Sequence, residues 1–95
     1  MKYIVFWEYD PNEIDKAVKK LIEFRDEIKK NPERYAKPVT PNYTMSVGFK
    51  GFQLFEAENS EQLARMVLHY RPEVKFEIIP ITETKKTVKL YHDSK

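Results

Sequence analysis

The stretch over residues 50–70, KGFQLFEAENSEQLARMVLHY, constrains the fold most, because it passes from strand chemistry to helix chemistry within a few positions. Its first part, over residues 51–57, is rich in aromatic and other strand-favouring side chains and predicts a strand. Asn59 can then cap a helix, and Gln62, three residues later, can complete a capping box. The stretch therefore predicts a strand followed closely by a helix over residues 60–70.

Similar signals divide the rest of the chain. Asp10 followed by Pro11 is the clearest helix start, because aspartate caps a helix and proline suits its first turn. Gly48 and Gly51 indicate a hairpin before the strand over residues 51–57. Apolar periodicity predicts the remaining elements: strands over residues 2–9, 43–49 and 74–81, a helix over residues 11–30, and a short terminal helix within residues 82–91.

The resulting order, β-α-β-β-α-β, is that of a ferredoxin-like α+β domain. We expect a single domain over residues 1–95, with four strands in the order 4-1-3-2, numbered along the chain. Right-handed crossovers would place both helices on one face of the sheet, and the first and third strands side by side and parallel. The connection over residues 31–42 contains three prolines, which predicts irregular backbone and a candidate lid or interface segment.

The strands carry large apolar side chains on both faces, whereas the helices would cover only one face. Some of the following residues are therefore expected to point away from the helices: Tyr3, Val5, Trp7, Tyr43, Met45, Val47 and Phe49. Aromatic residues make up 14% of the chain, and an uncovered aromatic sheet face is an unusual surface for a monomer. We expect a homodimer that packs through the sheet face, and pairing into a higher oligomer is left open.

The chain resembles the dimeric α/β-barrel superfamily over nearly its whole length, and more narrowly a small prokaryotic family of unassigned function. The resemblance rests on the opening MKYIVFWEY, on GFQLFEAENSEQLARMV, and on the closing VKFEIIPI before a terminal helix. It implies two ferredoxin-like units packed sheet to sheet. Members of the superfamily include monooxygenases, haem-degrading enzymes, cyclases, isomerases and ligand-sensing domains, but the chain contains none of their catalytic motifs.

Composition narrows the partners that we expect. A net charge of +2, from 17 basic and 15 acidic residues, disfavours nucleic acid and anionic membranes as partners. No apolar run approaches the length of a membrane span, and the first residues lack a signal-peptide pattern, so we expect a cytoplasmic protein. The absence of cysteine and the 34% of charged residues suit a thermostable protein.

Four apolar residues are candidates for a ligand pocket: Trp7, Tyr9, Tyr43 and Met45. They would suit a planar or partly apolar molecule. The alternative is that these side chains pack in the dimer interface. The two interpretations are compatible, because a barrel formed by two sheets can enclose a cavity.

Arg25 lies within the apolar face of the first predicted helix, where it could bind an anionic ligand or simply extend its head to solvent. His69 of the second predicted helix could carry a proton or bind a metal at the edge of a cleft, or could be a surface residue beside the apolar face. Glu8 could act as a base if buried beside aromatic rings, and is otherwise an edge carboxylate. His92 lies in a polar tail. Since no acidic ligand pair accompanies these histidines, we expect no metal and no cofactor.

The favoured function is binding of a small, partly apolar molecule. A cofactor-independent enzyme, similar to a monooxygenase or an isomerase, is the first alternative. An RNA-binding domain is a minor alternative, because residues 50–55, KGFQLF, partly match the third-strand signature of RNA-recognition motifs. Leu54 and Ala57 stand where that signature has base-stacking aromatic residues, so much of the stacking surface would be lost.

Overall fold

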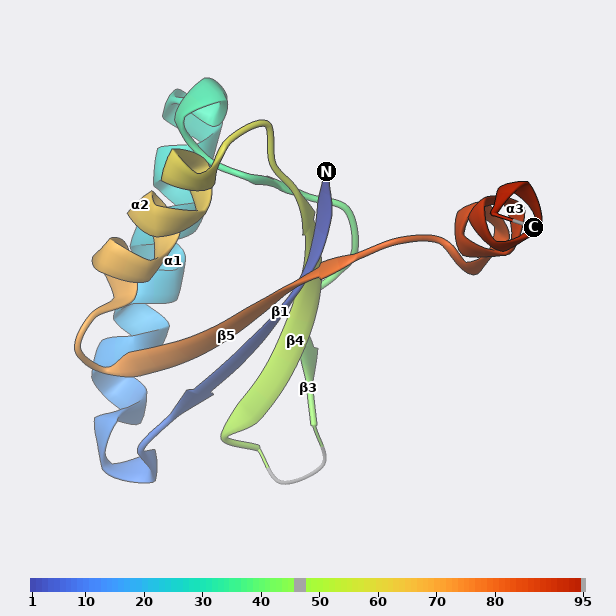
Figure 1. Ribbon diagram of the computed structural model, residues 1–95. Coiled ribbons are helices and arrows are strands. Elements are labelled where there is room, and N and C mark those ends of the chain that lie inside the picture. The colour runs from blue at the N-terminus through green and yellow to red at the C-terminus, as the bar shows by residue number, and fades with distance from the viewer. Residues whose placement is uncertain (46–47, 95) are drawn as a thin grey trace.

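The computed structural model describes residues 1–45 and 48–94, and has two helices packed against one face of an antiparallel sheet (Figure 1). The strands are β1 (Lys2–Tyr9), β2 (Lys37–Pro38), β3 (Tyr43–Thr44), β4 (Lys50–Glu56) and β5 (Val74–Ile81). The α-helices are α1 (Ile14–Lys30), α2 (Ser60–Tyr70) and α3 (Thr84–Asp93), and the 3-10 turns are η1 (Pro11–Glu13) and η2 (Pro32–Arg34). The predicted α+β class is confirmed.

β1 is the central strand and pairs antiparallel with β4 on one side and with β5 on the other. The order is β2-β4-β1-β5, with β3 also paired to β4, so five strands replace the predicted four in the order 4-1-3-2. The extra strand, β2, comes from the proline-rich connection, and Pro38 is tolerated there because β2 is at the sheet edge.

Two further expectations about the sheet need correction. The first and third predicted strands, β1 and β4, are neighbours but not parallel, because the hairpin before β4 reverses the chain. The predicted strand over residues 43–49 is shorter, since only Tyr43 and Thr44 form β3. Ser46 and Val47 lie outside the described residues. Gly48 has a φ of +89°, which places a glycine where the hairpin needs a left-handed backbone.

The two helix starts that the sequence predicts are confirmed by their caps. The Asp10 side chain accepts a hydrogen bond of 2.8 Å from the backbone N–H of Asn12, and η1 leads into α1. The Asn59 side chain accepts one of 3.1 Å from the backbone N–H of Gln62, and the Gln62 side chain accepts one of 2.8 Å from the backbone N–H of Glu58. These bonds satisfy N–H groups that a helix start leaves unpaired.

The register of the sheet separates a covered face from a bare one. Tyr3, Val5, Trp7 and Tyr9 of β1 lie on the face toward α1 and α2, and Val5 is fully buried. Of the seven residues among which some were expected to point away from the helices, Tyr3, Val5 and Trp7 therefore face the helices, whereas Tyr43 faces away. The core between sheet and helices is built from side chains of all the main elements: Val5, Phe24, Phe55, Leu63, Met66, Tyr70 and Val74.

The opposite face of the sheet is bare of helices (Figure 1). Cross-strand pairing places its residues in four rows: Lys37–Glu56–Lys2–Ile81, Leu54–Ile4–Ile79, Phe52–Phe6–Glu77 and Lys50–Glu8–Lys75. The two middle rows are mostly apolar and the outer rows are mostly charged. Tyr43 of β3 extends the apolar part, because it pairs with Phe52 and its ring lies 5.4 Å from the Phe52 ring.

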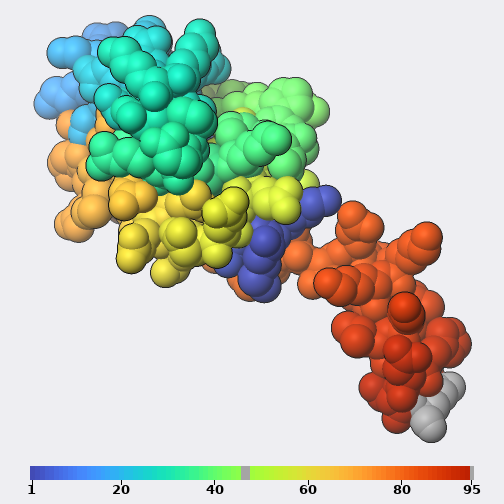
Figure 2. Space-filling view, turned by 90° about the horizontal axis from the view of Figure 1, so that it is seen from above, coloured from blue at the N-terminus to red at the C-terminus, as the bar shows by residue number. Residues whose placement is uncertain are grey.

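α3 projects away from the rest of the molecule (Figures 1 and 2). The predicted terminal helix is thus confirmed, although all ten of its residues are exposed. The radius of gyration is 15.3 Å, whereas a compact chain of this length has one of about 12 Å. The projecting helix accounts for the elongated shape, which measures 52 × 32 × 20 Å.

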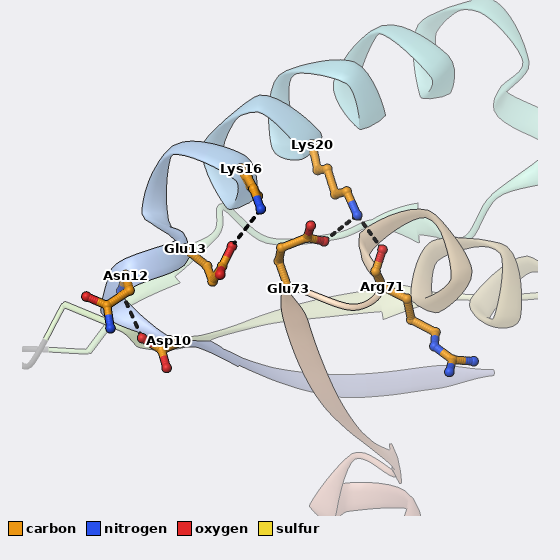
Figure 3. Close-up of polar contacts among 7 residues, drawn as sticks. All are labelled: Asp10, Asn12, Glu13, Lys16, Lys20, Arg71 and Glu73. Atoms are coloured by element: carbon orange, nitrogen blue, oxygen red, sulfur yellow. Dashed lines mark hydrogen bonds and ion pairs between the residues drawn. The ribbon is translucent and has the colours of Figure 1, made fainter.

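A lysine side chain joins the helix layer to the sheet layer at the turn before β5. Lys20 of α1 donates hydrogen bonds to the carbonyl oxygen of Arg71 and to the carboxylate of Glu73, both in the turn before β5 (Figure 3). The hydrogen bond from Lys20 lowers the pKa of Glu73 below its ordinary value, more than partial burial raises it. Glu13 and Lys16 form a weaker, more exposed ion pair of 3.5 Å nearby.

Replacing Lys20 by methionine should lower the urea midpoint at pH 7, because the turn before β5 loses its tie to α1. Since the folded state lowers the pKa of Glu73, its contribution to stability is present well above pH 4.5 and is lost as the pH falls toward the lowered value. The gap between wild type and Lys20→Met should therefore narrow in acid. Lys19→Met, an exposed change on the same helix, is the control. Equal midpoints for the two variants at pH 7 would contradict this role.

Candidate functional site

A cavity of about 600 Å³ lies between α1 and the helix-facing side of the sheet. One wall comes from β1, β4 and β5, and the other from α1 and the last turn of α2. The segment between β2 and β3 closes one side through Pro38, Pro41 and Asn42. The proline-rich connection thus forms part of the cavity wall.

Trp7 and Tyr9 form an aromatic platform at this wall. Their rings stack at a centroid separation of 5.9 Å and an interplanar angle of 10°. The indole N–H of Trp7 donates a 2.7 Å hydrogen bond to the side-chain oxygen of Asn42, and the Tyr9 hydroxyl donates one of 3.3 Å to the carbonyl of Gly48. Each ring is therefore held by stacking and by a hydrogen bond at its polar end, so the platform is preformed.

Gly51 makes room for the Trp7 ring. It lies opposite Trp7 in the β1–β4 pairing. A Cβ at this position would lie 2.1 Å from Cζ2 of Trp7 and 2.2 Å from the carbonyl oxygen of Tyr43. Such distances are too short for any side chain, so glycine is required by the close approach of the Trp7 indole and of the Tyr43 carbonyl.

The far end of the cavity is formed by packed aromatic rings. The Tyr70 ring lies 5.3 Å from Phe24 and 5.4 Å from Phe76, in tilted and edge-on arrangements. Burial strongly raises the pKa of Tyr70, and the nearby positive charge of Arg25 opposes this effect only in part. The Tyr70 hydroxyl therefore stays protonated at neutral pH and can donate a hydrogen bond.

Arg25 of α1 also lines the cavity. It is the only charged side chain among the described lining residues, which include neither a carboxylate nor a histidine. The remaining polar groups are the Trp7 indole N–H, amides and hydroxyls, and several already have partners. Asn42 accepts from Trp7, the Tyr9 hydroxyl donates to the Gly48 carbonyl, and the side-chain amide of Gln53 donates a 2.9 Å hydrogen bond to the Thr40 carbonyl. The cavity therefore combines apolar walls with a single cationic group.

The family described as "Domain of unknown function (DUF3303)" matches residues 1–95. The chain belongs to this family. No curated protein matches the chain. The family description names no activity, so the site is interpreted from its geometry.

The structure brings together only half of the six ligand-binding residues predicted from sequence. Trp7, Tyr9 and Arg25 line the cavity of this family member. Tyr43 lies on the bare face of the sheet, and Met45 is exposed at the hairpin. His69 packs its ring 5.4 Å from Phe24, and its Nε2 lies 2.8 Å from the Lys20 carbonyl oxygen. Those three side chains are absent from the cavity lining.

The other titratable candidates also lie elsewhere. Glu8 is not buried beside aromatic rings, because even-numbered positions of β1 face the bare side of the sheet. Its carboxylate lies 3.6 Å from the Lys50 ammonium and half of its side chain is exposed. His92 is on the projecting helix α3, with its ring 5.6 Å from that of Tyr91. Within residues 1–45 and 48–94, no group of three acidic, histidine or cysteine side chains could hold a metal ion.

Sequence reasoning missed several lining residues, including Tyr70, Phe76, Asn42 and Gln53. The sequence assigns Tyr70 and Phe76 to apolar faces that form the core. The only sign of a place in a cavity wall was that the chain has more aromatic rings than a small core needs. Asn42 lies in irregular backbone, whose path no periodic pattern gives.

None of the helices in the described part of the chain is both long and apolar enough to span a membrane.

Substituting Gly51 by alanine should displace the Trp7 ring and lower the free energy of unfolding by about 1–3 kcal/mol, the usual cost of overpacking. Trp7 is the only tryptophan, so its emission reports the displacement directly. Gly48→Ala is the matched control: its Cβ would have no neighbour within 4 Å, and its cost of about 1–2 kcal/mol is backbone strain alone. An unchanged emission spectrum in Gly51→Ala would contradict the close approach.

Proposed function

We propose that the protein binds a small, partly apolar molecule in the cavity between α1 and the sheet. The observation that carries this proposal is the cavity of about 600 Å³ beside the preformed Trp7–Tyr9 platform. Its volume falls within the range of about 300–1,000 Å³ typical of ligand pockets, and its mostly apolar walls with a few polar groups match such sites.

Binding is favoured over catalysis by the chemistry of the walls. The described lining residues supply no carboxylate and no imidazole, which are the usual general bases. Tyr70 is the most perturbed titratable group there, and its raised pKa makes it a poor base at neutral pH. A cofactor-independent enzyme is retained as the alternative. It would have to work by orienting its substrate and by donating a hydrogen bond from the Tyr70 hydroxyl.

We further propose that the chain is a ferredoxin-like unit of a homodimer packed through the bare sheet face, as in dimeric α/β-barrels. The accessible surface is 7085 Å², about 1,300 Å² more than a compact monomer of 11.4 kDa exposes. Specific dimers bury about 800 Å² per partner, so this excess would be sufficient. The bare sheet face and the projecting helix α3 are the two surfaces that a second copy would cover.

The charges on the bare face favour a second copy of the chain, rather than a polyanion, as the partner of this face. Its rows carry four lysines and three glutamates: Lys2, Lys37, Lys50, Lys75, Glu8, Glu56 and Glu77. The face therefore has an excess of only one positive charge, and its mixed charges can pair with those of a second copy. The aromatic group Phe6, Phe52 and Tyr43 favours RNA as a second candidate, since rings on a sheet can stack on bases. A face with one excess positive charge, however, lacks the strongly positive surface that phosphate binding requires.

Binding can be tested with N-phenyl-1-naphthylamine, a neutral apolar dye whose emission rises when it leaves water. The wild type should bind it with micromolar affinity. Val18 lines the cavity and is 46% exposed, so Val18→Phe can fold while filling the cavity, and should weaken binding about tenfold or more. Ile22→Phe, at a 56% exposed position of the same helix outside the cavity lining, is the control. Equal binding by both variants would refute the cavity as the site.

Sedimentation at micromolar protein concentration tests the dimer. The wild type should sediment as twice the 11.4 kDa chain, and Phe52→Glu should be a folded monomer, because it buries a charge in the proposed interface. Leu68→Glu is the control, since Leu68 is 64% exposed on α2. A monomeric wild type that binds single-stranded RNA in a salt-dependent way, with binding lost in Phe52→Ala, would replace the dimer with the RNA-binding alternative.

A further inference from the structure

We propose that the cavity selects an organic monoanion, namely a small aromatic carboxylate whose ring lies against the apolar walls and whose carboxylate binds Arg25. This inference rests on the proposed function, because it specifies the ligand class of the same cavity. It is carried by the charge of the cavity, the unpaired guanidinium of Arg25 and the position of the Tyr70 hydroxyl.

The cavity carries a net positive charge. Arg25 is the one charged group among its described lining residues, and the walls around it are aromatic or aliphatic. Low-dielectric walls of this kind focus the field of a single charge into the cleft and raise the local concentration of anions. A neutral ligand would gain apolar contacts and hydrogen bonds here, whereas an anion would gain these and an electrostatic interaction with Arg25.

Arg25 has no acidic partner in the described part of the chain. Within its own helix, the neighbouring positions one turn away hold Leu21, Ile22, Ile28 and Lys29, so no carboxylate can reach it at helical spacing. No ion pair with an acid of another element within residues 1–45 and 48–94 involves it either. The planar guanidinium, with its fork of N–H donors, is thus available to bind a carboxylate with two parallel hydrogen bonds.

Tyr70 supplies a second donor at the same end of the cavity. Arg25 and Tyr70 line the same cavity, and Phe24, which is next to Arg25 in α1, has its ring 5.3 Å from the Tyr70 ring. The Tyr70 ring is buried, and its hydroxyl forms no hydrogen bond with the described residues and remains open to a ligand. A carboxylate bound to Arg25 can therefore accept a further hydrogen bond from this hydroxyl.

The other polar groups of the cavity leave Arg25 and Tyr70 as the main partners for a polar ligand group. Asn42 and Gln53 already bond to Trp7 and to the Thr40 carbonyl, so they offer less to a ligand. The Trp7–Tyr9 platform and the Phe76 ring then offer faces for an apolar body. The arrangement fits one anionic end and one planar apolar end, which is the chemistry of an aromatic carboxylate.

The test compares two probes of the same shape, 4-phenylbutyrate and 4-phenyl-1-butanol, by calorimetry with wild type and variants. The wild type should bind the carboxylate about tenfold more tightly than the alcohol. Arg25→Gln should abolish this preference, so that the carboxylate binds no more tightly than the alcohol. Tyr70→Phe, which keeps the buried ring, should weaken binding of the carboxylate a few-fold. Lys19→Gln makes the same charge change on an exposed part of α1 outside the cavity lining, and should retain the preference.

The outcomes distinguish the two proposals. Equal affinities of the wild type for the two probes, or a preference that survives in Arg25→Gln, would overturn the anion selectivity while leaving the binding cavity in place. If Lys19→Gln lost the preference as Arg25→Gln does, the effect would be one of net charge and the assignment to Arg25 would fall. If neither the probes nor the naphthylamine dye bound the wild type, the proposed function itself would fall.

Discussion

The antiparallel pairing of β1 with both β4 and β5 is the constraint on which the rest of the structure depends. It fixes the register of three strands at once, and a shift by one residue would move every side chain to the other face. In this register Val5 enters the core, Trp7 lies over Gly51, and Phe6 and Phe52 meet on the bare face. The cavity and the apolar sheet surface are thus two consequences of the same pairing.

The side chains around the cavity show how a small domain combines packing with an open site. Several of the α1 side chains that line the cavity are small or medium in size, and Phe24 of α1 packs with Tyr70 and Phe76 in a ring cluster. Lys20 ties α1 to the turn before β5 at the protein surface. These contacts hold α1 in place although the space between it and the sheet is not filled by side chains. Protein interiors are otherwise densely packed.

Part of the candidate site was predictable, and the reason for the rest is geometric. Trp7, Tyr9 and Arg25 were identified from their place in strand and helix patterns, and all three line the cavity. Tyr43 and Met45 were grouped with them because both are apolar, but the pleat of β3 turns Tyr43 to the other face. Asn42, which holds the Trp7 indole, lies in a connection whose path depends on contacts with β4 and not on local preference.

The sequence by itself determined the α+β class, the helix starts at Asp10 and Asn59, and the terminal helix, because these depend on caps and periodicity within one segment. Tertiary structure alone decided the extra strand β2, the antiparallel direction of β4 relative to β1, and which strand face the helices cover. Alternation along a strand defines two faces but does not label them, and both faces of β1 are apolar. Only the packing of α1 and α2 distinguishes the face that holds the cavity from the bare one.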